Sequence, residues 1–238
     1  MNKRAIILAG GKGARLRPYT VVLPKPLMPV GDYPVLEIII RQLSFYGFDQ
    51  ITLTVNHQAE IIKAFFGDGS KWNIRIDYSF EDRPLSTMGP LKLIHDLPDN
   101  FLIMNGDVLT DLDFNAFYHF HKENKRIFSI SGYSRTDVSE YGVLKLGEGN
   151  LLNGFIEKPR YDYTVSMGIY MAKKEILNYI PANVPFGFDN LMIDLLAKQE
   201  DVIIQRHEGY WLDIGRPDDY ARAVDDLEQL KDKLMPWE

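Results

Sequence analysis

The chain contains no cysteine among its 238 residues. That absence excludes disulfide bonds, thiolate metal sites and cysteine nucleophiles, and it fits a reducing compartment. A basic surplus is missing too, because 33 acidic residues outnumber 27 lysines and arginines and the formal net charge is −6. Proteins that bind nucleic acid usually carry a basic stripe, and this sequence has none, so no nucleic-acid partner is expected. Phosphates must then be bound by a few well-placed cations or by a metal ion.

Long apolar runs are absent as well. No stretch approaches the roughly 20 residues of a membrane span, so no membrane partner is expected. The N-terminus has Lys3 and Arg4 before a short apolar run at residues 5–9, which is also how secretory signals begin. This run is shorter than a signal core, and glycines follow it at once. We therefore expect a buried strand here and a cytoplasmic location.

The first half of the chain alternates between strand-like and helix-like patterns. Apolar runs and period-two alternation predict strands at residues 4–9, 51–55, 74–80 and 101–104. Helical spacing of apolar residues predicts helices at residues 35–46, 59–66, 90–95 and 114–121. Strands that alternate with helices of this length are typical of βαβ units, so a mostly parallel sheet is expected.

The pattern changes after residue 126. Strands are predicted at residues 128–133, 143–146, 152–157 and 165–172, and a turn at 147–150 joins the middle two as a hairpin. Helices follow at residues 173–179 and 189–198 and from Pro217 to about residue 234. The apolar stripe of the last helix is expected to pack against the body, and a homo-oligomer contact is the alternative.

These patterns together predict one α/β domain over residues 1–238. A Rossmann-like mixed sheet, mostly parallel and flanked by helices, is expected, with a small antiparallel portion inserted in it. Residues 1–125 form the nucleotide-binding half of this domain, and residues 126–238 form the second half.

A glycine-rich segment, LAGGKGARLRP at residues 8–18, follows the first strand directly. Its three glycines in four positions let backbone amides approach a phosphate chain, and Lys12 and Arg15 add positive charge. The spacing excludes a P-loop, and a dinucleotide-binding loop would need a glycine where Leu16 stands. A turn that only closes the strand is the remaining alternative.

Lys25 lies in a second cationic segment, between Pro24 and Pro26. The two prolines restrict the backbone and hold the lysine in position, so little entropy is lost when it binds an anion. An exposed lysine in a turn is the alternative.

Together, LAGGKGARLRPYT and LPKPLMPV resemble the signature of the sugar 1-phosphate nucleotidylyltransferases, GGxGTRLxPLT followed by PKP. Ala14 and Tyr19 depart from that signature, but neither change removes a charge. The resemblance continues through residues 105–107 (NGD), 157–159 (EKP), 165–170 and 209–220, and so covers nearly the whole chain. It implies the nucleotide-diphospho-sugar transferase fold and a sugar-phosphate-binding second half.

The resemblance also implies roles for individual residues. Arg15 and Lys25 would be the catalytic cations, and Asp107 and Asp213 would hold Mg²⁺. The nucleotide is expected to contact Leu8, Ala9, Gly10, Gly11, Gly13, Ser86 and Gly89. The sugar phosphate is expected to contact Gly142, Glu157, Lys158 and Ser166.

Asp107 also fits its metal-binding role by position. It follows an apolar strand, and ligands of parallel sheets bind beyond the carboxyl ends of the strands. Mg²⁺ is usually held by one or two carboxylates together with phosphates and waters. A turn or helix cap is the alternative for Asp107, and Asp111 and Asp113 could serve equally as caps.

The segment expected to contact the base departs from the family pattern. The family's LGTAGAL reads LSTMGPL here, with Ser86 in place of a glycine and Met88 in place of a small residue. Met88 could fill the core or contact a base. The choice of base is therefore left open by this segment.

The implied reaction joins a nucleoside triphosphate to a sugar 1-phosphate and releases pyrophosphate. The attacking phosphate has a second pKa of about 6, so no general base is needed at neutral pH. Two segments, PKPLMPVGDYPVLE and WLDIGRPDDY, are most similar to the mannose 1-phosphate guanylyltransferase branch, which implies GTP with mannose 1-phosphate or a heptose-type sugar. Uridylyl, thymidylyl or cytidylyl transfer, a non-catalytic nucleotide-sugar-binding protein and a nicotinamide oxidoreductase are the alternatives.

Overall fold

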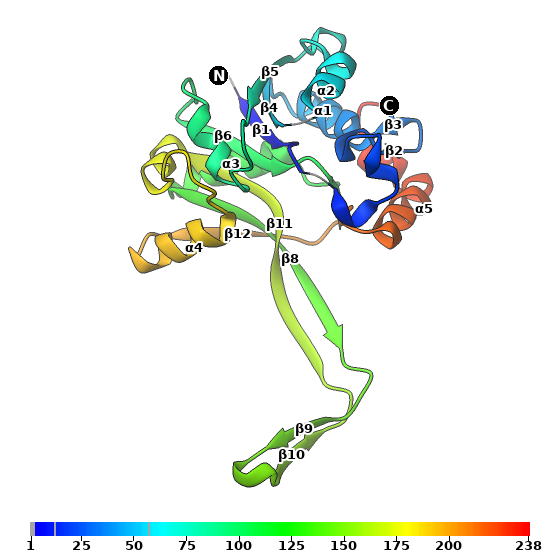
Figure 1. Ribbon diagram of the computed structural model, residues 1–238, viewed down its shortest axis with the longest axis vertical. Coiled ribbons are helices and arrows are strands. Elements are labelled where there is room, and N and C mark those ends of the chain that lie inside the picture. The colour runs from blue at the N-terminus through cyan, green and yellow to red at the C-terminus, as the bar shows by residue number, and fades with distance from the viewer. Residues whose placement is uncertain (1–2, 12, 57) are drawn as a thin grey trace.

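The fold is built on one central sheet. A computed structural model describes residues 3–11, 13–56 and 58–238, and its sheet has seven strands in the order β12–β8–β11–β6–β1–β4–β5 (Figure 1). Only β11 runs antiparallel to its neighbours, while the other adjacent pairs are parallel. The predicted mixed, mostly parallel sheet is therefore confirmed. Its strands are β1 (Arg4–Leu8), β4 (Gln50–Val55), β5 (Arg75–Phe80), β6 (Asn100–Asn105), β8 (Phe128–Val138), β11 (Arg160–Lys173) and β12 (Val202–His207).

Helices cover both faces of the sheet and make two hydrophobic clusters. Because successive strand residues point to opposite faces, Ile7 belongs to one cluster and Ile6 to the other. The first cluster contains α1 (Val35–Phe45), α2 (Ala59–Phe66), α3 (Phe114–Asn124) and α5 (Pro217–Leu234). The second contains α4 (Phe188–Ala197) and the 3-10 helices Gly89–Leu93 and Lys174–Tyr179. Across the described ranges, no helix is both long and apolar enough to cross a bilayer.

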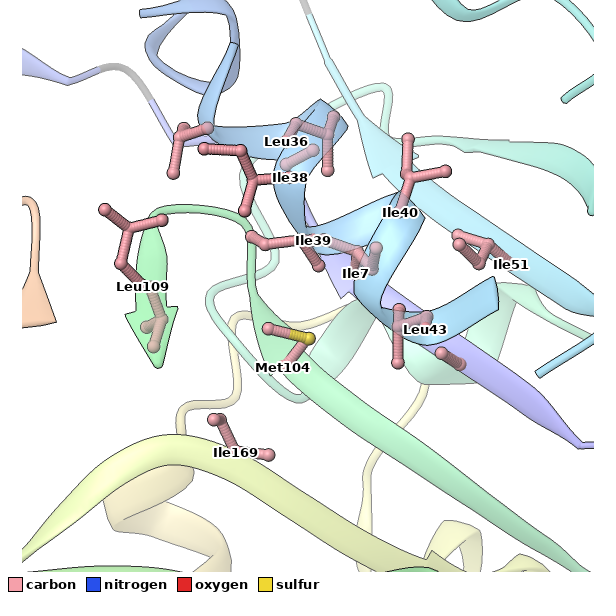
Figure 2. Packing of buried hydrophobic residues seen from close by; sticks show 14 of the residues in the cluster. Ile7, Leu36, Ile38, Ile39, Ile40, Leu43, Ile51, Met104, Leu109 and Ile169 are labelled. Carbon is pink, nitrogen blue, oxygen red and sulfur yellow. The ribbon is translucent and has the colours of Figure 1, made fainter. Parts of the chain in front are cut away.

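Helix α1 is the best-buried helix of the first cluster. Figure 2 shows Ile39 and Leu43 of α1 facing Ile7 of β1 and Met104 of β6. All four side chains are completely buried. This packing fixes β1 and β6 against one helix, and so fixes the loops that follow both strands.

The carboxyl ends of three parallel strands meet at one edge of the sheet. In the register, Leu8 of β1 lies beside Thr54 of β4 and beside Asn105 of β6. The chain leaves β1 toward β4 on one side and reaches β6 on the other, so the strand order reverses between β1 and β6. Ligands of open α/β sheets bind in the crevice at such a point.

Two short strand pairs were not predicted. Strand β7 (Val108–Thr110) pairs with β13 (Trp211–Asp213), and the register places Asp213 opposite Val108. This pairing brings the C-terminal part of the chain to the end of β6. Strands β2 (Pro29–Val30) and β3 (Tyr33–Pro34) form a small hairpin before α1.

An arm of antiparallel strands projects from the sheet. Strand β12 ends beside Tyr133, but β8 and β11 stay paired as far as Val138 and Arg160. The chain between them forms a second hairpin of β9 (Val143–Leu146) and β10 (Leu152–Ile156), far from the body of the protein (Figure 1). We call residues 134–164 the arm. The hairpin and the antiparallel portion were predicted, but the predicted strands 128–133 and 165–172 were too short.

The arm was missed because its strands have no buried face. After Tyr133, β8 continues with four polar or charged residues in a row, and the residues from Arg135 to Val138 are exposed. A period-two hydrophobic signal needs one face against a core, and this ribbon has none. The helices predicted at 90–95 and 173–179 are 3-10 helices instead, and Pro90 in the first of them lacks a backbone N–H.

Asp113 begins α3 and offers a test of its stability. Its Oδ1 accepts a hydrogen bond of 2.8 Å from the backbone N–H of Ala116. Asp113→Ala removes this N-cap and should lower the free energy of unfolding by ~1 kcal/mol, as measured by urea denaturation. Asp113→Asn keeps an acceptor and should stay close to wild type; equal losses in both variants would show that the cap does not matter.

Candidate active site

Two adjoining cavities open at the carboxyl edge of the sheet, with volumes of about 260 Å³ and about 540 Å³. They share Leu8, Gly11 and Asp107. The first is lined by Leu8, Ala9, Gly11, Gly13, Ala14, Arg15, Lys25, Pro26, Gly106, Asp107 and Gly215. The second is lined by Leu8, Gly10, Gly11, Thr54, Asn56, Glu81, Pro84, Ser86, Thr87, Asn105 and Asp107. The structure thus brings together most of the residues predicted to bind the nucleotide, together with Arg15, Lys25 and Asp107.

The glycine-rich loop is held at both ends and open in the middle. Gly13 adopts a φ of +58°, and a Cβ atom there would lie 2.8 Å from Cγ2 of Thr20. Thr20 also donates a hydrogen bond of 2.7 Å to the carbonyl of Gly13. At the other end, Asn56 donates to the carbonyl of Gly10. Nothing lies within 4 Å of a Cβ built on Gly11, so its backbone is accessible to an anion. Lys12 lies outside the described residues.

Two cations border the first cavity. Arg15 follows Gly13 in a 3-10 turn, and its Nη2 lies 3.2 Å from a Cβ built on Gly215. Lys25 begins another 3-10 turn, in which Met28 donates a 3.0 Å hydrogen bond to its carbonyl. The ammonium of Lys25 pairs with the carboxylate of Asp107, and only 12% of the lysine side chain is exposed. The sequence interpretation of Lys25 as a positioned cation, and not a surface turn residue, fits this placement.

Asp107 and Asp213 form a pair of carboxylates beside these cations. Burial raises the pKa of Asp213, the negative charge of Asp107 raises it further, and Lys25 and Arg15 oppose both effects. Each carboxylate has a buried Oδ1 without a hydrogen-bond partner among the described residues. Buried acceptors of this kind are costly unless a cation or donor meets them.

These two oxygens fit Mg²⁺. No described histidine or third carboxylate joins them, which matches the preference of Mg²⁺ for one or two carboxylates completed by phosphates and waters. The other candidates are structural. Asp111 accepts hydrogen bonds from the N–H of Tyr210 and from His207, and Asp113 caps α3.

The second cavity contains polar residues that no motif singled out. They are Thr54, Asn56 and Glu81. Asn56 directly follows β4 and Glu81 directly follows β5, so the rule that ligands bind beyond parallel strands could have found both. Glu81 is half-buried and accepts a 3.1 Å hydrogen bond from the N–H of Leu85. Its burial raises the pKa of the Glu81 carboxyl.

Some residues of segment 85–91 line the second cavity, and others are buried in the hydrophobic core. Ser86 lines the second cavity with a φ of +64°, a left-handed conformation that glycine adopts easily. This explains why the family pattern has glycine there. Met88 is completely buried in the second hydrophobic cluster, so it is a core residue. Gly89, which was predicted to contact the nucleotide, is buried and is not among the residues that line the cavity; its N–H donates to the carbonyl of Phe186 at 3.0 Å.

Three of the four residues predicted to contact the sugar phosphate lie on the arm, away from both cavities. They are Gly142, Glu157 and Lys158. Gly142 packs against Phe155, while Glu157 and Lys158 are exposed. The four residues predicted to contact the sugar phosphate therefore do not lie around one pocket of this chain. The continuous pairing of residues 132–138 of β8 with residues 160–166 of β11 carries the three residues outward.

Ser166 is different, because it lies at the base of the arm. Its Oγ accepts a hydrogen bond from the N–H of Gly168 at 3.2 Å. Gly168 has a φ of +74°, and a Cβ there would lie 2.5 Å from Nδ2 of Asn105, a residue of the second cavity. This close approach of Gly168 to Asn105 places the irregular part of β11, between Ser166 and Tyr170, beside the second cavity.

A third hollow of about 570 Å³ adjoins the first cavity. Arg15 and Gly215 line both. Its other walls come from the base of the arm, from β13 and from the start of α5, and include Arg135, Arg216 and Asp219. The motif at residues 209–220 supplies part of this hollow, including the predicted metal ligand Asp213.

Replacement of Asp213 tests the charge repulsion within the pair. An unfolded aspartate has a pKa of about 3.9, and the folded pKa of Asp213 is higher. Between these values the unfolded state releases its proton first, so stability falls as pH rises. In EDTA, Asp213→Asn should therefore melt at a higher temperature than wild type near pH 7, and calorimetry should show the difference shrinking toward pH 4. Asp225→Asn on the exposed side of α5 is the control, and a wild type that is more stable at neutral pH would contradict the repulsion.

Comparison with known proteins identifies the family of this chain. The nucleotidyl transferase family model matches residues 4–230. A UTP–glucose-1-phosphate uridylyltransferase of Synechocystis sp. is 34% identical over 93% of this chain and 62% of its own length. The mannose-1-phosphate guanylyltransferase catalytic subunit beta of Drosophila pseudoobscura pseudoobscura is 32% identical over 98% of this chain and 65% of its own length. The chain thus spans less than two thirds of the length of these relatives.

A solved structure resembles the chain over nearly its full length. HddC from Yersinia pseudotuberculosis superimposes with a TM-score of 0.73 at 28% sequence identity, covering 94% of this chain and 99% of that one. Its complex with GMP-PN gives a TM-score of 0.72. The family that the sequence motifs predict is confirmed: this chain belongs to the sugar 1-phosphate nucleotidylyltransferases of the nucleotidyl transferase family.

Proposed function

We propose that the protein transfers a nucleotidyl group from a nucleoside triphosphate to a sugar 1-phosphate and releases pyrophosphate. One observation carries the proposal. At the point where the strand order reverses, an open glycine loop, Arg15, Lys25 and Asp107 line one cavity, and Asp213 lies in the adjoining hollow. Asp107 and Asp213 each have a buried oxygen without a partner among the described residues. This set of groups suits a polyphosphate with its metal ion.

The reaction needs positioning and charge stabilisation more than proton transfer. An oxygen of the sugar 1-phosphate attacks the α-phosphorus, and the bond from that phosphorus to the bridging oxygen of pyrophosphate breaks. The attacking phosphate is already ionised at neutral pH, so no base is required. Arg15 and Lys25 stabilise the charge on the triphosphate, and the loop amide of Gly11 holds a phosphate oxygen.

Asp107 and Asp213 would hold the Mg²⁺ ion. When bound, the ion neutralises charge on the triphosphate and on the departing pyrophosphate. Lys25 meanwhile limits the repulsion between the two carboxylates, since its charge lowers the pKa of Asp213.

We further propose GTP as the nucleotide and mannose 1-phosphate or a heptose-type sugar 1-phosphate as the acceptor. The guanylyltransferase among the relatives supports this choice, and the uridylyltransferase among them keeps uridylyl transfer as the main alternative. Glu81 supports guanine. Its half-buried carboxylate lines the second cavity and accepts one hydrogen bond, from the N–H of Leu85. Guanine presents two adjacent N–H donors where uracil presents one.

Lys25→Ala tests the catalytic assignment. The loss of a cation that acts on the transition state should lower turnover by several hundredfold or more, as measured by pyrophosphate release. Lys63→Ala, which removes an exposed lysine of α2, should keep wild-type turnover. Turnover near wild type in the Lys25 variant, with its circular dichroism spectrum unchanged, would remove Lys25 from the mechanism.

Glu81→Gln tests the base assignment. Pyrophosphate release is first measured for GTP, UTP, dTTP, CTP and ATP with Mg²⁺, against mannose 1-phosphate, glucose 1-phosphate and a heptose 1-phosphate. GTP should be preferred in wild type. The variant should lose roughly 10- to 100-fold in kcat/KM for GTP and change little for UTP, because an unpaired buried donor or acceptor costs discrimination. A uniform effect on all five triphosphates would assign Glu81 to another part of the nucleotide.

A further inference from the structure

The arm is the one large element that the body of the protein does not cover. Figure 1 shows it leaving the lower edge of the sheet, with its tip hairpin at the far end of the molecule. Beyond Tyr133 no third strand pairs with it, because β12 ends there. An isolated two-stranded ribbon is at best marginally stable in water, so such an arm is expected to have a partner surface.

The arm is also unusually apolar for an exposed ribbon. Its tip exposes large side chains, with 57% to 76% of each accessible to solvent: Tyr141, Leu144, Leu146, Leu151, Leu152 and Phe155. Contiguous exposed apolar side chains on a soluble domain mark an interaction surface. The arm has 31 residues (134 to 164), which is close to the roughly 20–30 residues that each side of a standard interface contributes.

The arm extends as a paired ribbon and does not lead back to its own active site. Six consecutive residue pairs join its strands from Tyr133 and Val165 to Val138 and Arg160. Neither of these strand segments contains glycine or proline. Side chains also bond across the ribbon: Tyr163 donates to Asp137, and Arg160 donates to Thr136 at 3.2 Å. The tip is therefore held away from the cavities of its own chain.

The two cavities at the sheet edge contain few cations, whereas the adjoining hollow has Arg135, Arg216 and Arg222. Arg15 and Lys25 are the cations among the described residues that line the first two cavities, and Asp107 already pairs with Lys25. The proposed reaction holds two anions together, a triphosphate and a sugar phosphate. Lys158, which the family motif predicts to bind the sugar phosphate, is on the arm together with Glu157.

We propose that two copies of this chain exchange arms, so that Glu157 and Lys158 of each protomer complete the sugar-phosphate site of the other. The exchange rests on the proposed function for the role of these two residues. A second copy is the occupant because one chain carries both the arm and the site that lacks it. If a two-fold axis relates the two copies, each arm completes the site of the other copy, and the assembly is a closed dimer. The hollow of about 570 Å³ beside Arg15 is the entry for the incoming arm.

Subunit complementation tests the exchange. Lys25→Ala damages the body and leaves the arm intact, while Lys158→Ala does the reverse. Each variant alone should be nearly inactive. The two variants are combined in equal amounts, unfolded and refolded together, so that half of the dimers contain one copy of each variant. In each of these dimers, one of the two sites has an intact body and an intact arm. Activity should therefore recover to about one quarter of wild type. A mixture no more active than the two separate variants would overturn the exchange, and so would full activity of Lys158→Ala.

Two further measurements test arm exchange without relying on enzymatic activity. If the wild-type protein releases no pyrophosphate, that result counts against the proposed function and not against the exchange. The absence of cysteine allows Lys158→Cys to carry a thiol-linked photo-crosslinker at a single position. Crosslinking should give a product of dimer size that maps to residues 211–222 of a separately tagged copy. Crosslinks within one chain, or none to this region, would overturn the exchange.

Sedimentation velocity provides the second measurement. The wild-type protein should be a dimer, and Leu152→Ser at the tip, where the side chain is 63% exposed, should shift it toward monomer. Leu196→Ser on α4, where the side chain is 69% exposed, is the matched control and should leave the dimer intact. A monomeric wild-type protein, or equal effects of the two substitutions, would overturn the proposal.

Discussion

Everything at the carboxyl edge of the sheet depends on holding two carboxylates, Asp107 and Asp213, next to each other. Their charges repel, and each has a buried oxygen without a donor among the described residues. The ion pair with Lys25 offsets part of this cost, and the pairing of β7 with β13 prevents the two groups from separating. Sites that give up stability in this way are typical of function, because the missing interaction is supplied by the ligand. Here the ligand must bring positive charge, and a phosphate-bound metal ion does so.

The rest of the fold explains how this arrangement is kept in place. Alternation along β1, β6 and β11 gives one hydrophobic cluster on each face of the sheet. With both faces packed, the strands cannot shift in register without exposing buried side chains. The loops after β1, β4 and β6 are therefore anchored side by side, and the glycine loop needs only local contacts, such as that between Gly13 and Thr20, to present its backbone.

The sequence predicted those parts of the fold that depend on local signals. Helix α2 and strand β9 have the predicted ends, because amphipathic spacing and turn chemistry decide both. Strand β13 depends on β7, about a hundred residues earlier, and no local pattern reveals that pairing. The length of the arm was missed because neither of its faces is buried within the chain. In the site, motifs found the charged residues, while Glu81 follows only from its place at the end of β5.

The position of Lys158 is the point at which sequence and structure have to be reconciled. The motif predicts that this lysine binds a sugar phosphate, and the structure places it at the end of a paired ribbon directed away from the cavities. Bending the arm back within one chain would break the paired strands and leave the apolar tip exposed until it docked. Exchange between two copies keeps every strand pair, buries the tip and supplies the cation where two anions must meet. Arm exchange therefore satisfies the motif and the geometry together, and it makes the second copy part of the active site.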